Sequence, residues 1–322
     1  MRLKVLSVFA GMAILAGVLW LNAADLRSAG RILARVPSGV AISVAIHLPQ
    51  LAFTALAWRS LLPDAMRPPL TTMIELRLVR ESLNALIPAG AIVGQTFAAQ
   101  RLSRTGVTSS IAGATGTVDM TVEGATQAFI TLVGLVLLLS AKNSAKMGWF
   151  ALPGMALSVL AIVAMIAVQR HLPLRTIEAL GTKYPTIAGV GAWLAGLQHG
   201  IRRLHADYIT LARAAGWHLS AWVLGAVEVS WVLSLLGRPI NLADGLVVES
   251  LTQALRSAAF FVPGALGIQE GAIVAACALV GVPGDAALTL ALVRRGREIL
   301  LGLLGLVALR RRRSPPIGQS PR

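Results

Sequence analysis

The sequence is poor in charge and in aromatic residues, and it has a single cysteine. Charged residues make up 13% of the 322 residues, whereas an ordinary soluble domain has about 25%. The deficit extends along the whole chain, which excludes a soluble protein with one membrane anchor. Cys277 has no second cysteine to pair with, so an intrachain disulfide is excluded and the redox compartment is not revealed.

Motifs for nucleotide, acyl and metal chemistry are also absent from the sequence. There is no Gly-x-x-x-x-Gly-Lys-Ser/Thr phosphate loop and no Gly-x-Ser-x-Gly nucleophile turn. None of the five histidines has a metal-ligand spacing such as His-Glu-x-x-His. We therefore expect a protein with no cofactor and no metal that is not an enzyme.

Long apolar runs are what the chain has instead. Hydrophobic residues make up 56% of it and the mean hydropathy is +0.72. A helix that crosses a bilayer needs about 20 apolar residues, whereas barrel strands are ~9–11 residues long and alternate. The sequence therefore predicts an all-α, polytopic helical membrane protein with about six full spans, near 5–21, 38–58, 110–139, 148–168, 217–236 and 286–309. We expect the first run to be an uncleaved helix, because it is longer than a signal-peptide core.

The positive charge predicts the orientation of the chain. The net charge is +15, and most Lys and Arg lie at the ends of apolar runs, where they set topology, so nucleic-acid binding is not expected. The run Arg310–Arg313 places the C-terminus in the cytoplasm, and counting spans backwards places the connection 170–216 and the N-terminus there too. Within that connection, Arg202–Arg213 predicts an interfacial helix. The basic loop 22–37 does not fit this topology.

Two apolar segments, 72–104 and 244–282, are interrupted. The first contains IPAGAIVGQ (Ile87–Gln95) and the second VPGALGIQEG (Val262–Gly271). Proline removes a backbone donor and glycine relaxes the helix, while broken backbone at membrane depth must be buried in protein or line a wet cavity. We therefore predict two re-entrant helix–break–helix hairpins that act as gates. The residues expected at the breaks are Pro88, Gly90, Pro263, Gly264 and Gly267.

The two interrupted segments repeat each other at a constant offset of 175 residues. The matches include the break prolines Pro88 and Pro263 and the acids Glu123 and Glu298. Three predicted spans separate the hairpins, so the hairpins enter from opposite faces, as in the inverted repeats of secondary transporters. We expect one transmembrane domain over 1–313, with repeat halves near 72–139 and 244–309 and a disordered tail over 314–322.

Charged and amide side chains fall inside the apolar runs. A charge at the bilayer centre costs about 2.5–3.5 kcal/mol on insertion scales, so these groups should face inward. They form either a structural ion-pair network, for example Arg294 or Arg297 with Glu123, or a polar cavity for a lipid headgroup or a coupling proton. The candidate site residues are Glu81, Asn84, Asp119, Glu123, Glu249, Arg256, Gln269, Glu270, Arg294, Arg297 and Glu298.

Gln269 and Glu270 follow the second break directly. A half-helix that begins there would present free N–H groups and a positive dipole end to a ligand. The alternative is that Glu270 caps its own half-helix.

These segments resemble a known family of membrane proteins. Glu81-Ser-Leu-Asn84 with Ile87-Pro-Ala-Gly90, and Phe260–Gly271 with its Pro-Gly-x-x-Gly-x-x-Glu pattern, are similar to the transmembrane region of lysylphosphatidylglycerol synthases, often called flippase-like. Gln269 stands where many members carry Arg. The stretch Glu249–Gly271, followed by Leu292–Glu298, looks most like the HpnL-type branch found alongside hopanoid biosynthesis genes.

The resemblance implies a multi-pass protein of the bacterial inner membrane that moves or handles a lipid. The expected function is a lipid translocase or lipid-transport component for hopanoid or related lipids, with a hopanoid or an anionic phospholipid as the bound partner. The alternative is a non-catalytic membrane partner of lipid-biosynthesis enzymes. The synthases carry an aminoacyl-transfer domain after the membrane region, and this sequence has none, so aminoacyl-lipid synthesis is not implied.

Overall fold

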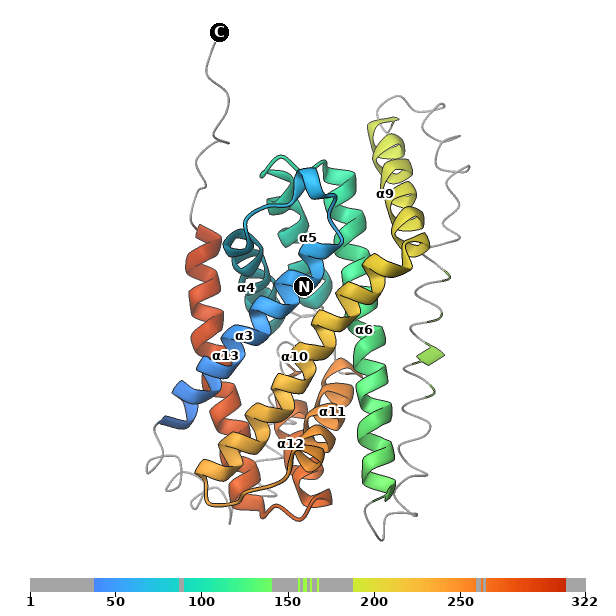
Figure 1. Cartoon of the computed structure of the whole chain (residues 1–322). Helices are drawn as coiled ribbons and strands as arrows, with labels where there is room; N and C mark the ends of the chain where they lie inside the picture. Colours follow the sequence, from blue (N-terminus) through green and yellow to red (C-terminus); the bar gives the residue numbers. More distant parts are fainter. Residues whose placement is uncertain are drawn as a thin grey trace.

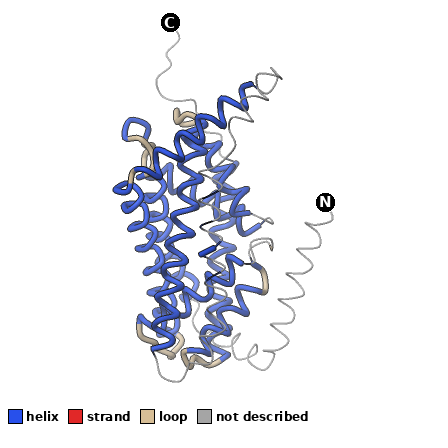
Figure 2. The backbone as a smooth tube through the Cα atoms, turned by 90° about the vertical axis from the view of Figure 1, so that its right-hand side faces the viewer, coloured by secondary structure: helices blue, strands red, loops and turns tan. Residues whose placement is uncertain are grey.

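The structure, a computed structural model, describes residues 38–86, 90–140, 156, 159–160, 163, 167, 188–258, 262 and 265–310. Every regular element in these ranges is helical (Figures 1 and 2). The elements are α3 (Ser38–Ser60), the 3₁₀ turn η1 (Asp64–Met66), α4 (Leu70–Leu86), α5 (Gly90–Ser103), α6 (Ser109–Ser140), α9 (Ala188–Ala206), α10 (Tyr208–Leu235), α11 (Leu242–Ala258), α12 (Ile268–Leu279) and α13 (Gly284–Arg310). The predicted span 5–21, the loop 22–37, most of 148–168 and the tail 314–322 lie outside the described residues.

Among the described residues, three helices are long and apolar enough to cross a membrane: α3, α6 and α10. They cover the predicted runs 38–58, 110–139 and 217–236, which are therefore confirmed as helices. The run 286–309 is also helical, as α13 of 27 residues. Its centre carries four charged residues, Arg294, Arg295, Arg297 and Glu298, which is why it is less apolar than the other three helices.

The single interfacial helix predicted for Arg202–Arg213 is wrong, because the chain breaks there at Asp207. The helix α9 ends at Ala206 and α10 begins at Tyr208. The Asp207 carboxylate accepts the Thr210 backbone N–H at 3.0 Å and its hydroxyl at 2.7 Å. This is an N-cap, which stabilises a new helix start in place of a continued helix. The same hydrogen bonds lower the pKa of Asp207.

A helix, a break, a shorter helix and a long helix occur twice in the same order, as α4–α5–α6 and as α11–α12–α13. The breaks fall where the sequence predicts them, although Pro88, Pro263 and Gly264 lie outside the described residues. Gly90 begins α5 against α4, where a Cβ atom would lie 2.4 Å from the Leu83 carbonyl oxygen. Gly267, with φ of +79°, is the N-cap of α12, a backbone conformation that favours glycine.

Each half has its own apolar core, and the halves are joined by crossed packing. One core lies among α3, α4, α5 and α6 and the other among α10, α11, α12 and α13. The long helix of each half packs on the first hairpin helix of the other, α6 on α11 and α13 on α4. At both crossings a glycine meets a serine: Gly134 lies against Ser250, and Gly305 lies against Ser82. The small residues let the helices approach closely.

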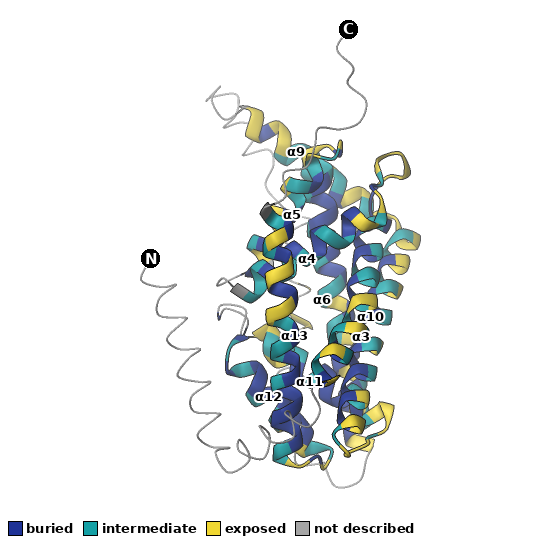
Figure 3. Cartoon of the chain, turned by 90° about the vertical axis from the view of Figure 1, so that its left-hand side faces the viewer, coloured by how far each residue is buried: buried dark blue, intermediate teal, exposed yellow. Residues whose placement is uncertain are grey.

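Burial in this molecule is inverted relative to a soluble protein. Large apolar side chains such as Phe129, Trp231 and Leu303 are more than half exposed, whereas Arg77 and Arg294 are almost fully buried. Figure 3 shows exposed positions along the outward face of α13. Water disfavours large exposed apolar surfaces, whereas lipid accommodates them. The pattern agrees with a membrane-embedded protein.

Candidate functional site

A polar cavity of about 300 Å³ lies among α3, α4, α6, α10, α11 and α13, and so between the two halves. Most of the residues singled out from sequence line it: Glu81, Asn84, Glu123, Glu249, Arg256, Arg294, Arg297 and Glu298. Asp119, Gln269 and Glu270 do not line the cavity. They lie behind its wall, where each binds a charged neighbour.

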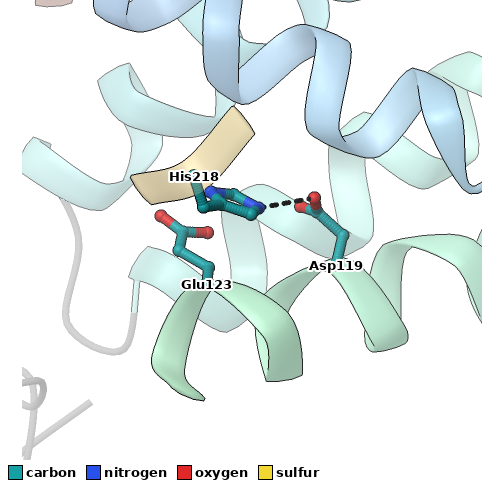
Figure 4. A group of neighbouring side chains, drawn as sticks. All are labelled: Asp119, Glu123 and His218. Carbon is teal, nitrogen blue, oxygen red and sulfur yellow. Dashed lines mark hydrogen bonds and ion pairs between the residues drawn. The ribbon is translucent and has the colours of Figure 1, made fainter. Parts of the chain in front are cut away.

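On the side of the first half, a buried cluster is centred on Asp119 of α6. Arg77 of α4 donates to one Asp119 oxygen at 2.5 Å, and His218 Nε2 of α10 lies 3.1 Å from the other. Figure 4 shows the His218 ring beside Asp119 and Glu123, two acids one turn apart on α6. Arg77, Asp119 and His218 are each at most 1% exposed. Asp119 is therefore held between Arg77 and His218, away from solvent.

On the side of the second half, Glu228 of α10 is fully buried and binds side chains of α3 and α13. It pairs with Arg297 of α13, accepts the Ser43 hydroxyl of α3 at 2.6 Å, and lies 3.6 Å from Arg294. Arg294 also donates to Glu249 of α11 at 2.5 Å. The four elements α3, α10, α11 and α13 are thus joined by one ion-pair network.

Glu298 of α13 and the residues after the second break form a third cluster. Glu298 accepts from Gln269 at 2.8 Å and from Arg295 at 2.9 Å. Glu270 accepts the Gly267 N–H at 2.8 Å and Arg295 Nε at 2.7 Å. Glu270 therefore caps its own helix, the second of the two alternatives drawn from the sequence.

The acids that match across the repeat have matching partners. Glu123 binds Arg80 of α4 at 2.6 Å, and Glu298 lies 3.3 Å from Arg256 of α11. In each half, then, the acid on the long helix pairs with an arginine on the first hairpin helix.

At another pair of matching positions the charges are reversed. Asp119 of α6 corresponds to Arg294 of α13 at the 175-residue offset. The first pairs with Arg77 on α4, whereas the second pairs with Glu249 on α11. In each half the residue at this position of the long helix thus pairs with the first hairpin helix, with opposite charges, although Arg77 and Glu249 do not themselves match at the offset.

A chain of hydrogen bonds through α3 joins Glu81 of the first half to Glu228. His47 Nε2 lies 3.1 Å from a Glu81 oxygen, and His47 Nδ1 lies 2.9 Å from Gln50 Oε1. Gln50 then donates to Glu228 at 3.3 Å. His47 and Gln50 both line the cavity, so α3 is the bridge between its two sides.

The pairing of Arg294 or Arg297 with Glu123 expected from the sequence is wrong. Glu123 is occupied by Arg80 and by Arg77, which lies 3.4 Å away, and both arginines come from α4. The two arginines of α13 turn instead toward Glu228 and Glu249. An ion-pair network exists, as one alternative expected, but each half is neutralised mainly within itself.

Asp119, Glu123 and His218 offer ligand atoms that all lie within 4.8 Å of one another. Both carboxylates are nevertheless bound by arginines, Arg77 on Asp119 and Arg80 on Glu123. A divalent cation placed there would face two guanidinium groups at close range. The group therefore fits a metal poorly.

The sequence reasoning missed several lining residues: His47, Gln50, Arg77, Arg80 and His218. Arg77 and Arg80 carry the one available signal, because they lie one turn apart with Glu81 in an interrupted apolar segment. His47 and His218 lie in otherwise apolar helices, where a single histidine gives no indication of its partner.

Comparison with known proteins gives one family. A family model described as the lysylphosphatidylglycerol synthase TM region matches residues 8–305. No curated protein and no solved structure matches the chain.

Proposed function

The chain belongs to the lysylphosphatidylglycerol synthase transmembrane-region family, and on this premise we propose that it is a lipid translocase or a lipid-transport component. Family membership indicates a membrane protein with a role connected to lipids. The proposal adds that this role is movement of a lipid and that the chain catalyses no chemical step.

The observation that carries the proposal is a charged cavity inside a bundle with an apolar exterior. Its accessible groups include both signs, since the side chains of Glu81, Glu123 and Arg256 are 38%, 23% and 23% exposed. A polar lipid headgroup needs such a path to cross the membrane, because its transfer into hydrocarbon is unfavourable. The tails of the lipid stay in the bilayer. In this mechanism the headgroup passes between the halves and the two helix–break–helix segments gate it.

For the substrate we propose a hopanoid or a related lipid, with an anionic phospholipid as the other candidate. The support is the resemblance of Glu249–Gly271 and Leu292–Glu298 to the hopanoid-associated HpnL-type branch. The basic run Arg310–Arg313 supports placement in the bacterial inner membrane with both termini in the cytoplasm.

Neutralising one matched acid tests the proposal. Glu298→Gln removes the charge that pairs with Arg256 and Arg295, and we expect loss of lipid movement in reconstituted vesicles while the protein still inserts. The matched control is Glu75→Gln on α4, an acid outside the cavity lining. Unchanged movement in the Glu298 variant would contradict the assignment.

A second function is favoured by one observation, namely that the lining charges largely satisfy one another. Such a network suits a stable scaffold that holds lipid-biosynthesis enzymes or their product. A scaffold would purify together with an enzyme and would keep its role in Glu123→Gln and Glu298→Gln variants.

A further inference from the structure

We propose that His47 and Glu81 together hold one exchangeable proton inside the cavity. The two side chains come from α3 and α4 and are 14% and 38% exposed. Both side chains line the cavity and are reachable from it.

Both ring nitrogens of His47 have a partner within hydrogen-bonding distance. Nδ1 lies 2.9 Å from Gln50 Oε1, and Nε2 lies 3.1 Å from Glu81 Oε2. An amide oxygen only accepts hydrogen bonds, and so does an ionised carboxylate. A neutral imidazole carries a single N–H and cannot donate to both.

The orientation of the Gln50 amide is fixed by Glu228. The amide nitrogen donates to Glu228 Oε2 at 3.3 Å. Arg297, Arg294 and the Ser43 hydroxyl also act on that carboxylate, and together they hold it ionised. Flipping the Gln50 amide would place its oxygen next to the Glu228 oxygen. Both atoms are acceptors, so no hydrogen bond could form. Gln50 Oε1 must therefore point at His47 Nδ1, which in turn must donate.

With Nδ1 donating, the contact between Nε2 and Glu81 requires one more proton. That proton lies either on Nε2, giving an imidazolium beside a carboxylate, or on Glu81, giving a carboxylic acid beside a neutral ring. In both forms the pair holds one proton more than a neutral imidazole with an ionised Glu81.

Charged groups from α4, α6, α10 and α13 lie around this pair. Arg80 of α4, Arg297 of α13 and Glu228 of α10 line the same cavity as His47 and Glu81. Glu123 of α6 neutralises Arg80 at 2.6 Å, and His218 of α10 is engaged by Asp119 at 3.1 Å. Both cations and anions therefore surround the pair.

Loss of the proton would weaken the link between α3 and α4. The Nε2 lone pair would then face the Glu81 carboxylate at hydrogen-bonding distance, an acceptor against an acceptor. This contact is relieved if the Glu81 side chain turns away from His47 or if α4, the first helix of the first hairpin, moves from α3. The use of this proton to couple lipid movement to a proton gradient rests on the proposed function, whereas the proton site itself does not.

The test is nitrogen NMR of the full chain in lipid nanodiscs, with ¹⁵N-labelled histidine at neutral pH. His47→Gln identifies the His47 signals by their loss. We expect an imidazolium at His47 in the unmodified protein and a neutral ring in Glu81→Gln, where the amide donates to Nε2. Glu75→Gln, on the same helix, should leave the imidazolium signal unchanged.

Infrared spectroscopy of the same samples detects the proton if it lies on the Glu81 carboxyl group. A carboxylic acid band that disappears in Glu81→Gln, with a neutral His47, also supports the site. A neutral His47 together with an ionised Glu81 in the unmodified protein would overturn it. Neither measurement requires transport, so a confirmed proton with no lipid movement would reject the proposed function and leave this inference standing.

Discussion

Asp119 depends on its partners more than any other acid on α6, because it is fully buried between Arg77 and His218. Removing one partner of a buried ion pair leaves the other charge uncompensated and costs about 3–5 kcal/mol. We expect Asp119→Asn to lower the free energy of unfolding in detergent by about that amount.

The control for this variant is Asp64→Asn, which breaks the exposed pair with Arg67. Exposed ion pairs contribute at most about 1 kcal/mol, because water and salt screen them. Equal stability of the two variants would contradict a buried role for Asp119.

The Asp207 carboxylate at the start of α10 should make the stability of the protein depend on pH. Its carboxylate accepts the Thr210 N–H and hydroxyl, and these bonds lower its pKa below the usual range for an aspartate. The ionised form is therefore bound more strongly in the folded state. Its stabilising contribution is present above the unfolded-state pKa and is lost as the pH falls through the lower, folded-state pKa.

Thermal unfolding followed over the acidic range checks this prediction. Asp207→Asn keeps an N-cap residue but cannot titrate, so part of the acid-dependent loss should disappear. An identical pH profile in that variant would show that Asp207 is not a contributor.

At the scale of elements, the crossed helix pairs depend on having no side chain at two glycines. A Cβ atom at Gly305 would lie 1.8 Å from the Ser82 hydroxyl oxygen and 2.6 Å from the Leu78 carbonyl oxygen. The carbonyl cannot move aside without shifting α4. Gly305→Ala should therefore destabilise the protein by about 1–3 kcal/mol, as overpacked sites do.

Gly302, one turn earlier on α13, gives the matched comparison for stability. A Cβ atom there meets nothing within 4 Å, so Gly302→Ala should leave the unfolding midpoint unchanged or raise it slightly through helix propensity. If both alanine variants have the same unfolding midpoint, the close crossing of α13 and α4 does not depend on Gly305.

The positions of α3, α6, α10 and α13 could be predicted from sequence, because long apolar runs and the length of a helical crossing are local properties. The break at Asp207 was missed, since the basic and apolar spacing continues through it while the cap depends on one side chain. The breaks after α4 and α11 were found because Pro88 and Pro263 cannot continue a helix.

The cavity was predictable only in part. Glu123 and Glu298 stand out because they match across the repeat and because charge within an apolar run must face inward. Their arginine partners, Arg80 and Arg256, lie about 40 residues away along the chain. His47 and Glu228 are 181 residues apart in the sequence, and Gln50 joins them only through the packing of α3 on α10.

For the whole molecule, the two halves should contribute comparably to lipid movement. Glu123 and Glu298 occupy matching positions and each binds an arginine on the first hairpin helix of its own half. We therefore expect Glu123→Gln and Glu298→Gln to reduce lipid movement in reconstituted vesicles to a similar degree. Loss in one variant alone would assign the path to one half and reject the equivalence.

The most direct test of lipid transport is a lipid inventory of a deletion strain, with inner and outer membranes separated, against the same strain complemented with the intact chain. Transport predicts that one lipid is made in normal total amount but collects in the wrong membrane, and that Glu298→Gln fails to restore its distribution. A lipid missing altogether would contradict transport and would place the protein in lipid synthesis.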